Sequence, residues 1–306
     1  MAAIPASPVS NWPAGAGVSR LQREQDDATR IGALLIAASK MKAEEVARVL
    51  DAQKGKNLLF GEAAISLGLI TQKDVGLVLS RQQGLPDLAA LDVPAGRDLV
   101  SLFAPQSPSA RALVGARSQL LMSEARITNR DLPHVLTIAS PNRNEGRSFV
   151  AANLAVLFSR LGMSTLLVDA NLHAPRQHAI FGTDSRQGLT SMLSGRVAGA
   201  PVVAIGGLPG LHLLSAGAPV PHPHDLLERS TSREKLLELA AQYDQVILDA
   251  PCAAEHPEWI ALCMMATETL LVARRDRTAM ADAASVASAV RNARGRVAGV
   301  LMNQFN

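Results

Sequence analysis

Residues 134–148 read HVLTIASPNRNEGRS, a mostly apolar run that passes through a short polar loop into a helical stretch. The run has the length and composition of a buried strand. From Ser148 to Leu161 apolar residues recur at helical spacing, with Val150 and Leu154 among them. A strand, a loop and a helix in direct succession aim backbone N–H groups and the positive end of the helix at a phosphate. The stretch therefore predicts an α/β fold with an anion site at the loop.

The same strand–helix alternation continues through the rest of the sequence. Short apolar strands that alternate with helices are typical of a mostly parallel sheet with helices on both faces. Ligands of such sheets bind at the carboxyl ends of the strands. We expect strands at His134–Ala139, Thr165–Asp169, Leu211–Ser215, Gln245–Asp249, Thr269–Ala273 and Val297–Met302.

Composition limits the classes of function. Of 306 residues, 48% are hydrophobic and only 3% aromatic, so the core must consist of Ala, Val, Leu and Ile. The net charge of +3 comes from scattered basic residues without interleaved aromatics, which argues against a nucleic-acid partner. Two cysteines form neither a disulfide framework nor a metal-ligand spacing. Without an apolar run of about 20 residues or a secretory signal, we expect a cytoplasmic protein with no membrane span of its own.

Two further segments carry carboxylates at predicted strand ends. Residues 165–175 read TLLVDANLHAP and residues 243–251 read YDQVILDAP, so Asp169 and Asp249 each close an apolar strand. A single strand-terminal Asp is often a turn or helix cap. Two of them beside a helix-opening loop supply the hard oxygen ligands that a magnesium–phosphate site needs. The sequence therefore predicts a nucleotide site with magnesium.

Taken together, the three segments resemble the Walker A, Walker A′ and Walker B motifs of the bacterial tyrosine kinases that control exopolysaccharide chain length. The likeness covers about residues 107–305. Within this family the chain is similar to the stand-alone EpsG-type chain-length-determinant kinases. It implies a P-loop NTPase fold of the deviant Walker type, preceded here by a small helical repeat domain. The related partitioning ATPases carry a signature Lys where this chain has Asn142, which favours the kinase branch.

The resemblance implies ATP and Mg²⁺ as ligands and assigns roles to particular residues. Asp169 would be catalytic. The phosphates would be held by Asn144, Glu145, Gly146, Arg147 and Ser148, and the metal by Ser148, Asp169 and Asp249. The chain departs from the family pattern in having Asn144 for Gly, Arg147 for Lys, Asn171 for a carboxylate, and His173 and Ala174 for two arginines. A planar guanidinium does not reproduce a compact ammonium between phosphates.

Two features that the family uses for regulation are altered. Its ring-forming motif Glu-x-x-Arg-x-x-Arg corresponds here to Arg111, Val114 and Arg117, so ring assembly is doubtful. Family members also phosphorylate a tyrosine-rich tail, whereas Tyr243 is the single tyrosine of this sequence. We therefore expect no phosphorylation of such a tail in cis.

An internal repeat occupies residues 30–82. Residues 31–36 and 60–65 match at an offset of 29, and both copies close on Leu-x-x-Gln. The repeat resembles the cyclic di-GMP-binding N-terminal module of type II secretion ATPases (the MshEN module). That resemblance implies a cyclic di-GMP site formed by Arg30, Gly32, Gln53, Gly61 and Gln82. The second copy has Leu59 at the Arg position, and a helical docking module without nucleotide is the alternative.

These observations predict four segments and leave two functions open. The segments are a disordered tail (1–28), a helical two-repeat domain (29–88), a linker (89–108) and a P-loop, kinase-like domain (109–306). The first function is an ATP-dependent tyrosine kinase acting in trans on polysaccharide-export partners. The second is a pseudokinase that docks on an inner-membrane chain-length determinant or co-polymerase, with peripheral membrane location through that partner. Arg147, Asn144 and Asn171 favour weak or lost activity.

Overall fold

The computed structural model describes residues 35, 41–56, 60–70, 98–124 and 134–304. The chain divides into two compact units, Met1–Leu85 and Pro86–Asn306. Each unit is described separately below.

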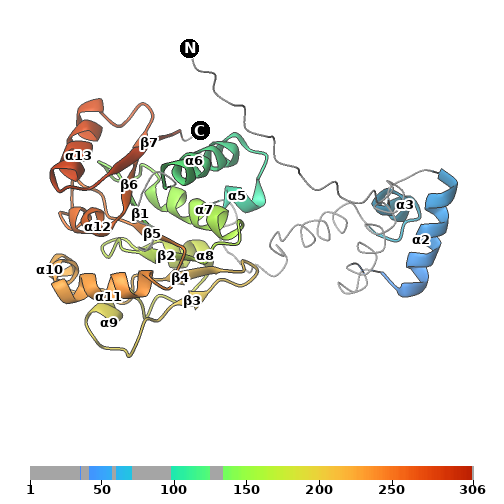
Figure 1. Ribbon diagram of the computed structural model, residues 1–306, viewed down its shortest axis with the longest axis horizontal. Coiled ribbons are helices and arrows are strands. Elements are labelled where there is room, and N and C mark those ends of the chain that lie inside the picture. The colour runs from blue at the N-terminus through green and yellow to red at the C-terminus, as the bar shows by residue number, and fades with distance from the viewer. Residues whose placement is uncertain (1–34, 36–40, 57–59, 71–97, 125–133, 305–306) are drawn as a thin grey trace, which may run out of the picture. The chain divides into compact units, whose positions relative to one another are not determined.

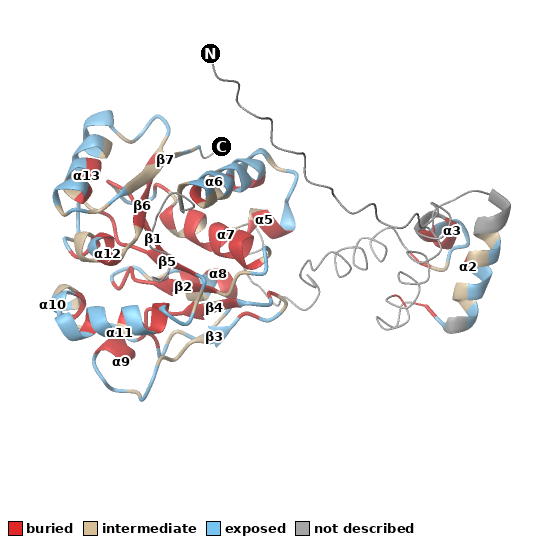
Figure 2. Ribbon diagram, in the orientation of Figure 1, coloured by how far each residue is buried: buried red, intermediate tan, exposed pale blue. Residues whose placement is uncertain are grey.

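A seven-stranded sheet forms the centre of the second unit (Figure 1). Its strand order is β3-β4-β2-β5-β1-β6-β7, and every neighbouring pair is parallel except β3 with β4. The strands are β1 His134–Ala139, β2 Thr165–Asp169, β3 Val203–Ala204, β4 Leu211–Leu214, β5 Gln245–Asp249, β6 Glu268–Arg274 and β7 Val297–Asn303. Every residue of β1, β2 and β5 is buried, because helices cover both faces of a parallel sheet (Figure 2).

Helices lie on both faces of this sheet. One apolar cluster joins the sheet to α5, α6, α7 and α8, and another joins it to α9, α10, α11, α12 and α13. The bounds are α5 Val100–Phe103, α6 Pro108–Glu124, α7 Arg147–Ser159, α8 Gln177–Phe181, α9 Leu189–Leu193, α10 Pro223–Glu228, α11 Ser230–Ala240, α12 Trp259–Met265 and α13 Met280–Asn292. The layered α/β fold expected from the sequence is confirmed.

Strand bounds agree closely with the expected ones. β1, β2 and β5 begin and end at the predicted residues, and β4, β6 and β7 differ by one residue at one or both ends. The sequence did not predict β3, an exposed two-residue strand that pairs antiparallel with β4. So short a segment carries no periodicity.

The described end of the predicted linker belongs to the second unit and packs on its core. Leu99 and Leu102 are buried in the cluster around α7. Asn153 of α7 donates to the carbonyl of Asp98 (2.7 Å) and accepts from the N–H (3.0 Å) and hydroxyl (2.8 Å) of Ser101. Within the linker predicted at 89–108, these long-range contacts hold residues 98–103 against α7.

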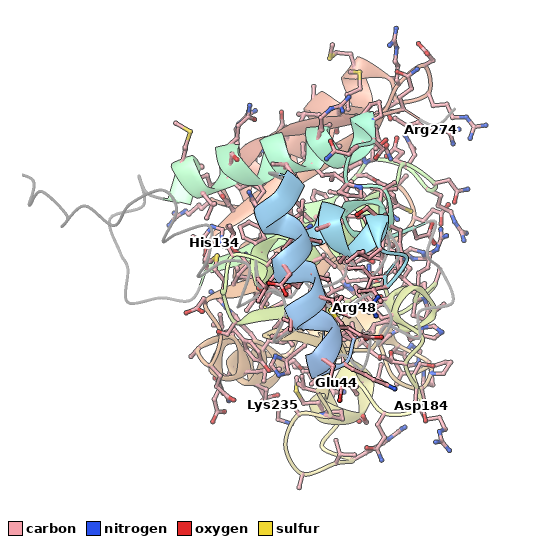
Figure 3. All side chains as sticks on the ribbon, turned by 90° about the vertical axis from the view of Figure 1, so that its right-hand side faces the viewer. Glu44, Arg48, His134, Asp184, Lys235 and Arg274 are labelled. Atoms are coloured by element: carbon pink, nitrogen blue, oxygen red, sulfur yellow. The ribbon has the colours of Figure 1, made fainter. Side chains whose placement is uncertain are left out.

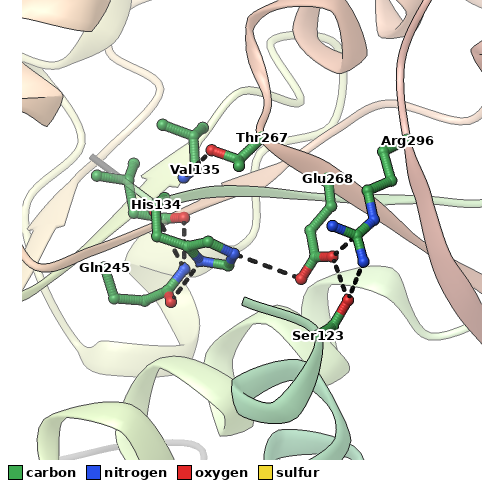
Figure 4. A network of polar contacts seen from close by, with 8 residues as sticks. Ser123, His134, Val135, Gln245, Thr267, Glu268 and Arg296 are labelled. Atoms are coloured by element: carbon green, nitrogen blue, oxygen red, sulfur yellow. Dashed lines mark hydrogen bonds and ion pairs between the residues drawn. The ribbon is translucent and has the colours of Figure 1, made fainter. Parts of the chain in front are cut away.

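A polar network joins strand beginnings at the amino edge of the sheet (Figure 4). His134 Nδ1 lies 2.8 Å from Gln245 Oε1, and its Nε2 lies 3.4 Å from Oε1 of the buried Glu268. Ser123, in the last turn of α6, donates to Glu268 Oε2 (2.9 Å), and Arg296 donates to Ser123 Oγ (2.8 Å). These contacts fasten α6 to the edge opposite the predicted ligand site.

The first unit is helical where it is described. Its helices α2 (Ala43–Lys56) and α3 (Phe60–Ser66) enclose a small apolar core that includes Val49, Phe60 and Ala64. Glu44 and Arg48 lie one turn apart on the exposed side of α2 (Figure 3). Helical packing of this kind agrees with the periodicity of the repeat. None of the described helices in either unit is both long and apolar enough to cross a bilayer.

Candidate functional site

The loop between β1 and α7 adopts left-handed backbone conformations at two positions. Asn144 has φ 60°, and Gly146, the residue that precedes α7, has φ 98°. Position 144, where the family has Gly, thus has a positive φ, the conformation that glycine adopts most readily. Asn tolerates it better than most residues. The loop conformation is therefore retained despite the substitution.

Arg147 begins α7 and points back into the loop. Its Nε donates to the carbonyl of Ala250 (3.0 Å), and its Nη1 donates to the carbonyl of Asn142 (2.8 Å) and to the hydroxyl of Ser140. The residue is 8% exposed. The guanidinium thus connects three acceptors that lie after β1 and after β5. The Arg147 guanidinium therefore already donates hydrogen bonds to its own chain.

Glu145 organises the loop from the inside. Its buried carboxylate accepts from the N–H of Asn142 (2.7 Å) and from the hydroxyl of Thr278. Its carbonyl accepts from Asn303 Nδ2 (3.0 Å). A carboxylate in this position repels phosphate, so only the backbone of Glu145 suits the phosphate-binding role that the resemblance implied.

Two carboxylates lie side by side at the carboxyl edge of the sheet. Asp169 and Asp249 are register partners on the neighbouring parallel strands β2 and β5, and neither is accessible to solvent. Asp169 Oδ2 accepts from the N–H groups of Arg176 and Gln177, each at 2.8 Å. Oδ1 of Asp169 and Oδ1 of Asp249 are buried without a hydrogen-bond partner among the described residues.

Burial dominates the protonation of this pair. It raises the pKa of Asp169 to about 8, the charge of Asp249 acts in the same direction, and the N–H groups of Gln177 and Arg176 oppose it. Burial also raises the pKa of Asp249, against hydrogen bonds from Ser148 and Gln177. Two adjacent buried carboxylates cannot both stay charged without a counter-ion. The pair therefore holds either a proton or a cation.

The residues present fit Mg²⁺. Hard oxygen ligands are what this ion prefers, and it needs few of them from the protein. The unpartnered oxygens of Asp169 and Asp249, together with the nearby Ser148, supply that donor set. All three residues were expected from the sequence, and the fold brings them to one edge.

Gln177 is a site residue that sequence reasoning missed. Its Nε2 donates to Asp249 Oδ2 (2.7 Å) and to the carbonyl of Ser148 (3.1 Å), which joins β5 to α7. Its type and spacing carry no signal for this role. Asn171 is directed elsewhere: its side chain donates to the carbonyl of Ala174 (3.0 Å) and accepts from the N–H of Ala174 (3.3 Å), closing a turn.

The residues predicted to bind cyclic di-GMP belong to the first unit. Arg30, Gly32 and Gln82 lie outside the described residues. Gln53 and Gly61 lie in α2 and α3, where only their backbone is described.

Comparison with known sequences finds tyrosine-protein kinases as relatives of this chain. The chain is 30% identical over 207 residues to the tyrosine-protein kinase YwqD of Bacillus subtilis, covering 68% of this chain and 86% of YwqD. It is 29% identical over 211 residues to the putative tyrosine-protein kinase EpsB of Ralstonia nicotianae, covering 69% of this chain. That match spans only 28% of the length of EpsB. No protein-family model matches the chain.

Solved structures share the fold. The kinase domain of the Escherichia coli tyrosine kinase ETK matches with a TM-score of 0.62 and 23% identity, covering 67% of this chain and 79% of that domain. The fold of this kinase domain is thus present here, as the loop and strand-end carboxylates led us to expect.

Proposed function

This chain belongs to the bacterial tyrosine-protein kinase family, and from that membership we propose that it is an ATP-binding regulator of exopolysaccharide chain length whose own kinase activity is weak or absent. It would act in the cytoplasm by docking on an inner-membrane polysaccharide co-polymerase. The relatives' names support a protein of the tyrosine-kinase type, and the pathway rests on the resemblance of the three motifs to those of exopolysaccharide chain-length kinases. The hydrogen bonds of Arg147 within the loop between β1 and α7 support the loss of activity.

The observation that carries the proposal is the engagement of Arg147. Phosphoryl transfer depends on cations positioned against the phosphate oxygens. Here the guanidinium is buried and donates to Ser140, Asn142 and Ala250. A hydrogen bond from a charged group contributes about 1.5–3 kcal/mol, so turning Arg147 toward a phosphate costs several such bonds. The loop therefore attracts ATP less well and positions it poorly.

Nucleotide binding itself keeps its supports. The N–H groups of the loop, the start of α7 and the carboxylates Asp169 and Asp249 are in place. Bound Mg²⁺ would supply positive charge against the phosphates. Ser148, Asp169 and Asp249 would hold it. These retained residues also favour the second candidate, a slow kinase that phosphorylates partner tyrosines in trans.

Magnesium-dependent ATP binding tests the proposed site. For the full chain we expect ATP to bind more tightly with Mg²⁺ than without it. Asp249→Ala should reduce the magnesium-dependent gain by at least about tenfold, because even loss of an outer-shell partner costs that much metal affinity. Calorimetry at equal ionic strength measures both affinities.

Asp184→Ala serves as the matched control, since Asp184 is exposed and pairs only locally with Arg186. It should leave ATP affinity unchanged. Equal ATP affinity for wild type and Asp249→Ala at every magnesium concentration would contradict a metal role for the carboxylate pair.

We also expect the chain to be monomeric in solution. Arg117 donates to the carbonyl of Leu157 in α7 (3.2 Å), and Arg111 donates to the carbonyl of Gln106 (2.7 Å). Both guanidinium groups thus contact their own chain, and like charges at an interface oppose association. Analytical ultracentrifugation should give a monomer for wild type, and Arg111→Glu with Val114→Arg should promote association. A stable octamer of the unmodified protein would refute this.

Cyclic di-GMP binding, which rests on the sequence alone, should be weak and depend on Arg30. One repeat keeps the Arg and the other has Leu59, so half of the expected guanidinium contacts are missing. Calorimetry should give micromolar or weaker affinity that Arg30→Ala abolishes. Tight binding that survives this substitution would place the ligand elsewhere.

A further inference from the structure

Three potential metal ligands outside the carboxylate pair come together from two loops. His173 follows β2, whereas His256 and Glu258 lie between β5 and α12. β2 and β5 are parallel neighbours, so the loops that follow them meet at the same edge of the sheet. The ligand atoms of the three side chains all lie within 4.8 Å of one another.

The two histidine rings face each other. Their centroids are 3.6 Å apart and the ring planes differ by 8°. His173 Nε2 contacts Oε1 of Glu258, which is only 2% exposed. Two imidazolium cations at this separation would repel strongly, so at least one ring is neutral and has a free lone pair. Glu258 adds a buried carboxylate to the cluster, so the three side chains together offer the charge and the nitrogen and oxygen donors to hold a cation.

Charged side chains lie beside His256. Glu255 Oε2 lies 3.6 Å from His256 Nε2, and Arg143 lies 3.4 Å from the same oxygen. At this distance Glu255 adds negative charge beside the ring without a hydrogen bond to it. The contact from Arg143 holds that carboxylate in turn, from the loop that precedes α7.

We propose that His173, His256 and Glu258 bind one divalent transition-metal ion of the zinc class. Two imidazole nitrogens and one carboxylate oxygen are a donor set that zinc accepts, with a fourth position left for water. Nitrogen ligands select against Mg²⁺, so this site differs in chemistry from the all-oxygen pair Asp169 and Asp249. The bound ion joins the loop after β2 to the loop after β5, which both border the candidate nucleotide site.

Zinc titration of the full chain tests the proposal. The protein is prepared without a polyhistidine tag, stripped with chelator and titrated with Zn²⁺ against a chromophoric competitor. We expect one equivalent to bind and millimolar Mg²⁺ not to displace it. His256→Ala should weaken Zn²⁺ binding by at least about tenfold, since loss of an outer-shell partner alone has an effect of that size. Bound Co²⁺ should give the intense visible absorption of a tetrahedral site.

Two further variants separate metal binding from folding. His173→Arg places a hydrogen-bond donor beside Glu258 but removes the imidazole, so the fold should be retained and zinc binding lost. His224→Ala is the matched control, because His224 lies 3.2 Å from Glu228 in an exposed pair on α10. It should bind zinc as wild type does.

Two results would overturn the proposal. Wild type that takes up no stoichiometric zinc would leave the cluster as an ion pair with a stacked ring. If His224→Ala loses as much zinc affinity as His256→Ala, the cluster is not the zinc site either.

Discussion

Arg147→Lys combined with Asn144→Gly should raise magnesium-dependent ATP turnover by on the order of 100-fold, because a misplacement of about 1 Å at the reacting group costs that much rate. The guanidinium reaches Ala250 from Nε and both Asn142 and Ser140 from Nη1, whereas a lysine at position 147 carries all its donors on one nitrogen. Its compact ammonium is then free to approach the phosphates. Turnover of ATP and transfer to a tyrosine-bearing peptide are the measurements.

The two substitutions should contribute unequally. Asn144 already has φ 60°, so Asn144→Gly removes a backbone cost of only about 1–2 kcal/mol and leaves the loop shape unchanged. Arg147→Lys alone should therefore give most of the gain. In the revertant background Asp249→Ala should abolish turnover. If wild type turns over ATP as fast as the revertant and loses that activity in Asp249→Ala, Arg147 is a working P-loop cation and the kinase is active.

Asp169→Asn should make the magnesium-free protein more stable than wild type at pH 8, by on the order of a few kcal/mol. The pKa of Asp169 is about 8 in the folded protein, raised by burial and by Asp249. An aspartate in the unfolded chain titrates near 4. Between about pH 4 and pH 8 the folded protein thus binds more protons than the unfolded chain, and its unfolding free energy falls as pH rises.

Asparagine removes this titration without emptying the position. Its carbonyl oxygen can accept from the N–H groups of Arg176 and Gln177 as Oδ2 of Asp169 does. Urea denaturation with EDTA at pH 5 and pH 8 should show a steeper loss for wild type than for Asp169→Asn. Added Mg²⁺ should stabilise wild type at pH 8 and have little effect on the variant. Parallel pH dependence of the two proteins would contradict the raised pKa.

The sequence by itself determined the fold and the strand ends at which the predicted metal ligands Asp169 and Asp249 lie. Apolar runs closed by Asp169 and Asp249 gave the bounds of β2 and β5, because a strand buried on both faces must be apolar throughout. The loop before α7 was recognisable for a similar local reason, since a strand, a polar loop and a helical periodicity follow one another within 30 residues. Parallel topology then required these carboxylates to meet at one edge.

Only the tertiary structure decided how the site residues are used. The direction of Arg147 depends on Ala250, which lies 103 residues away, and Gln177 reaches Asp249 across 72 residues. His173 meets Glu258 across 85 residues. Local patterns of hydrophobicity cannot encode such pairs. The partners come from segments that are distant in sequence, and the connections between parallel strands bring these segments together only in the folded chain. The packing of Leu99 and Leu102 against α7 has the same origin, since burial there depends on a distant helix.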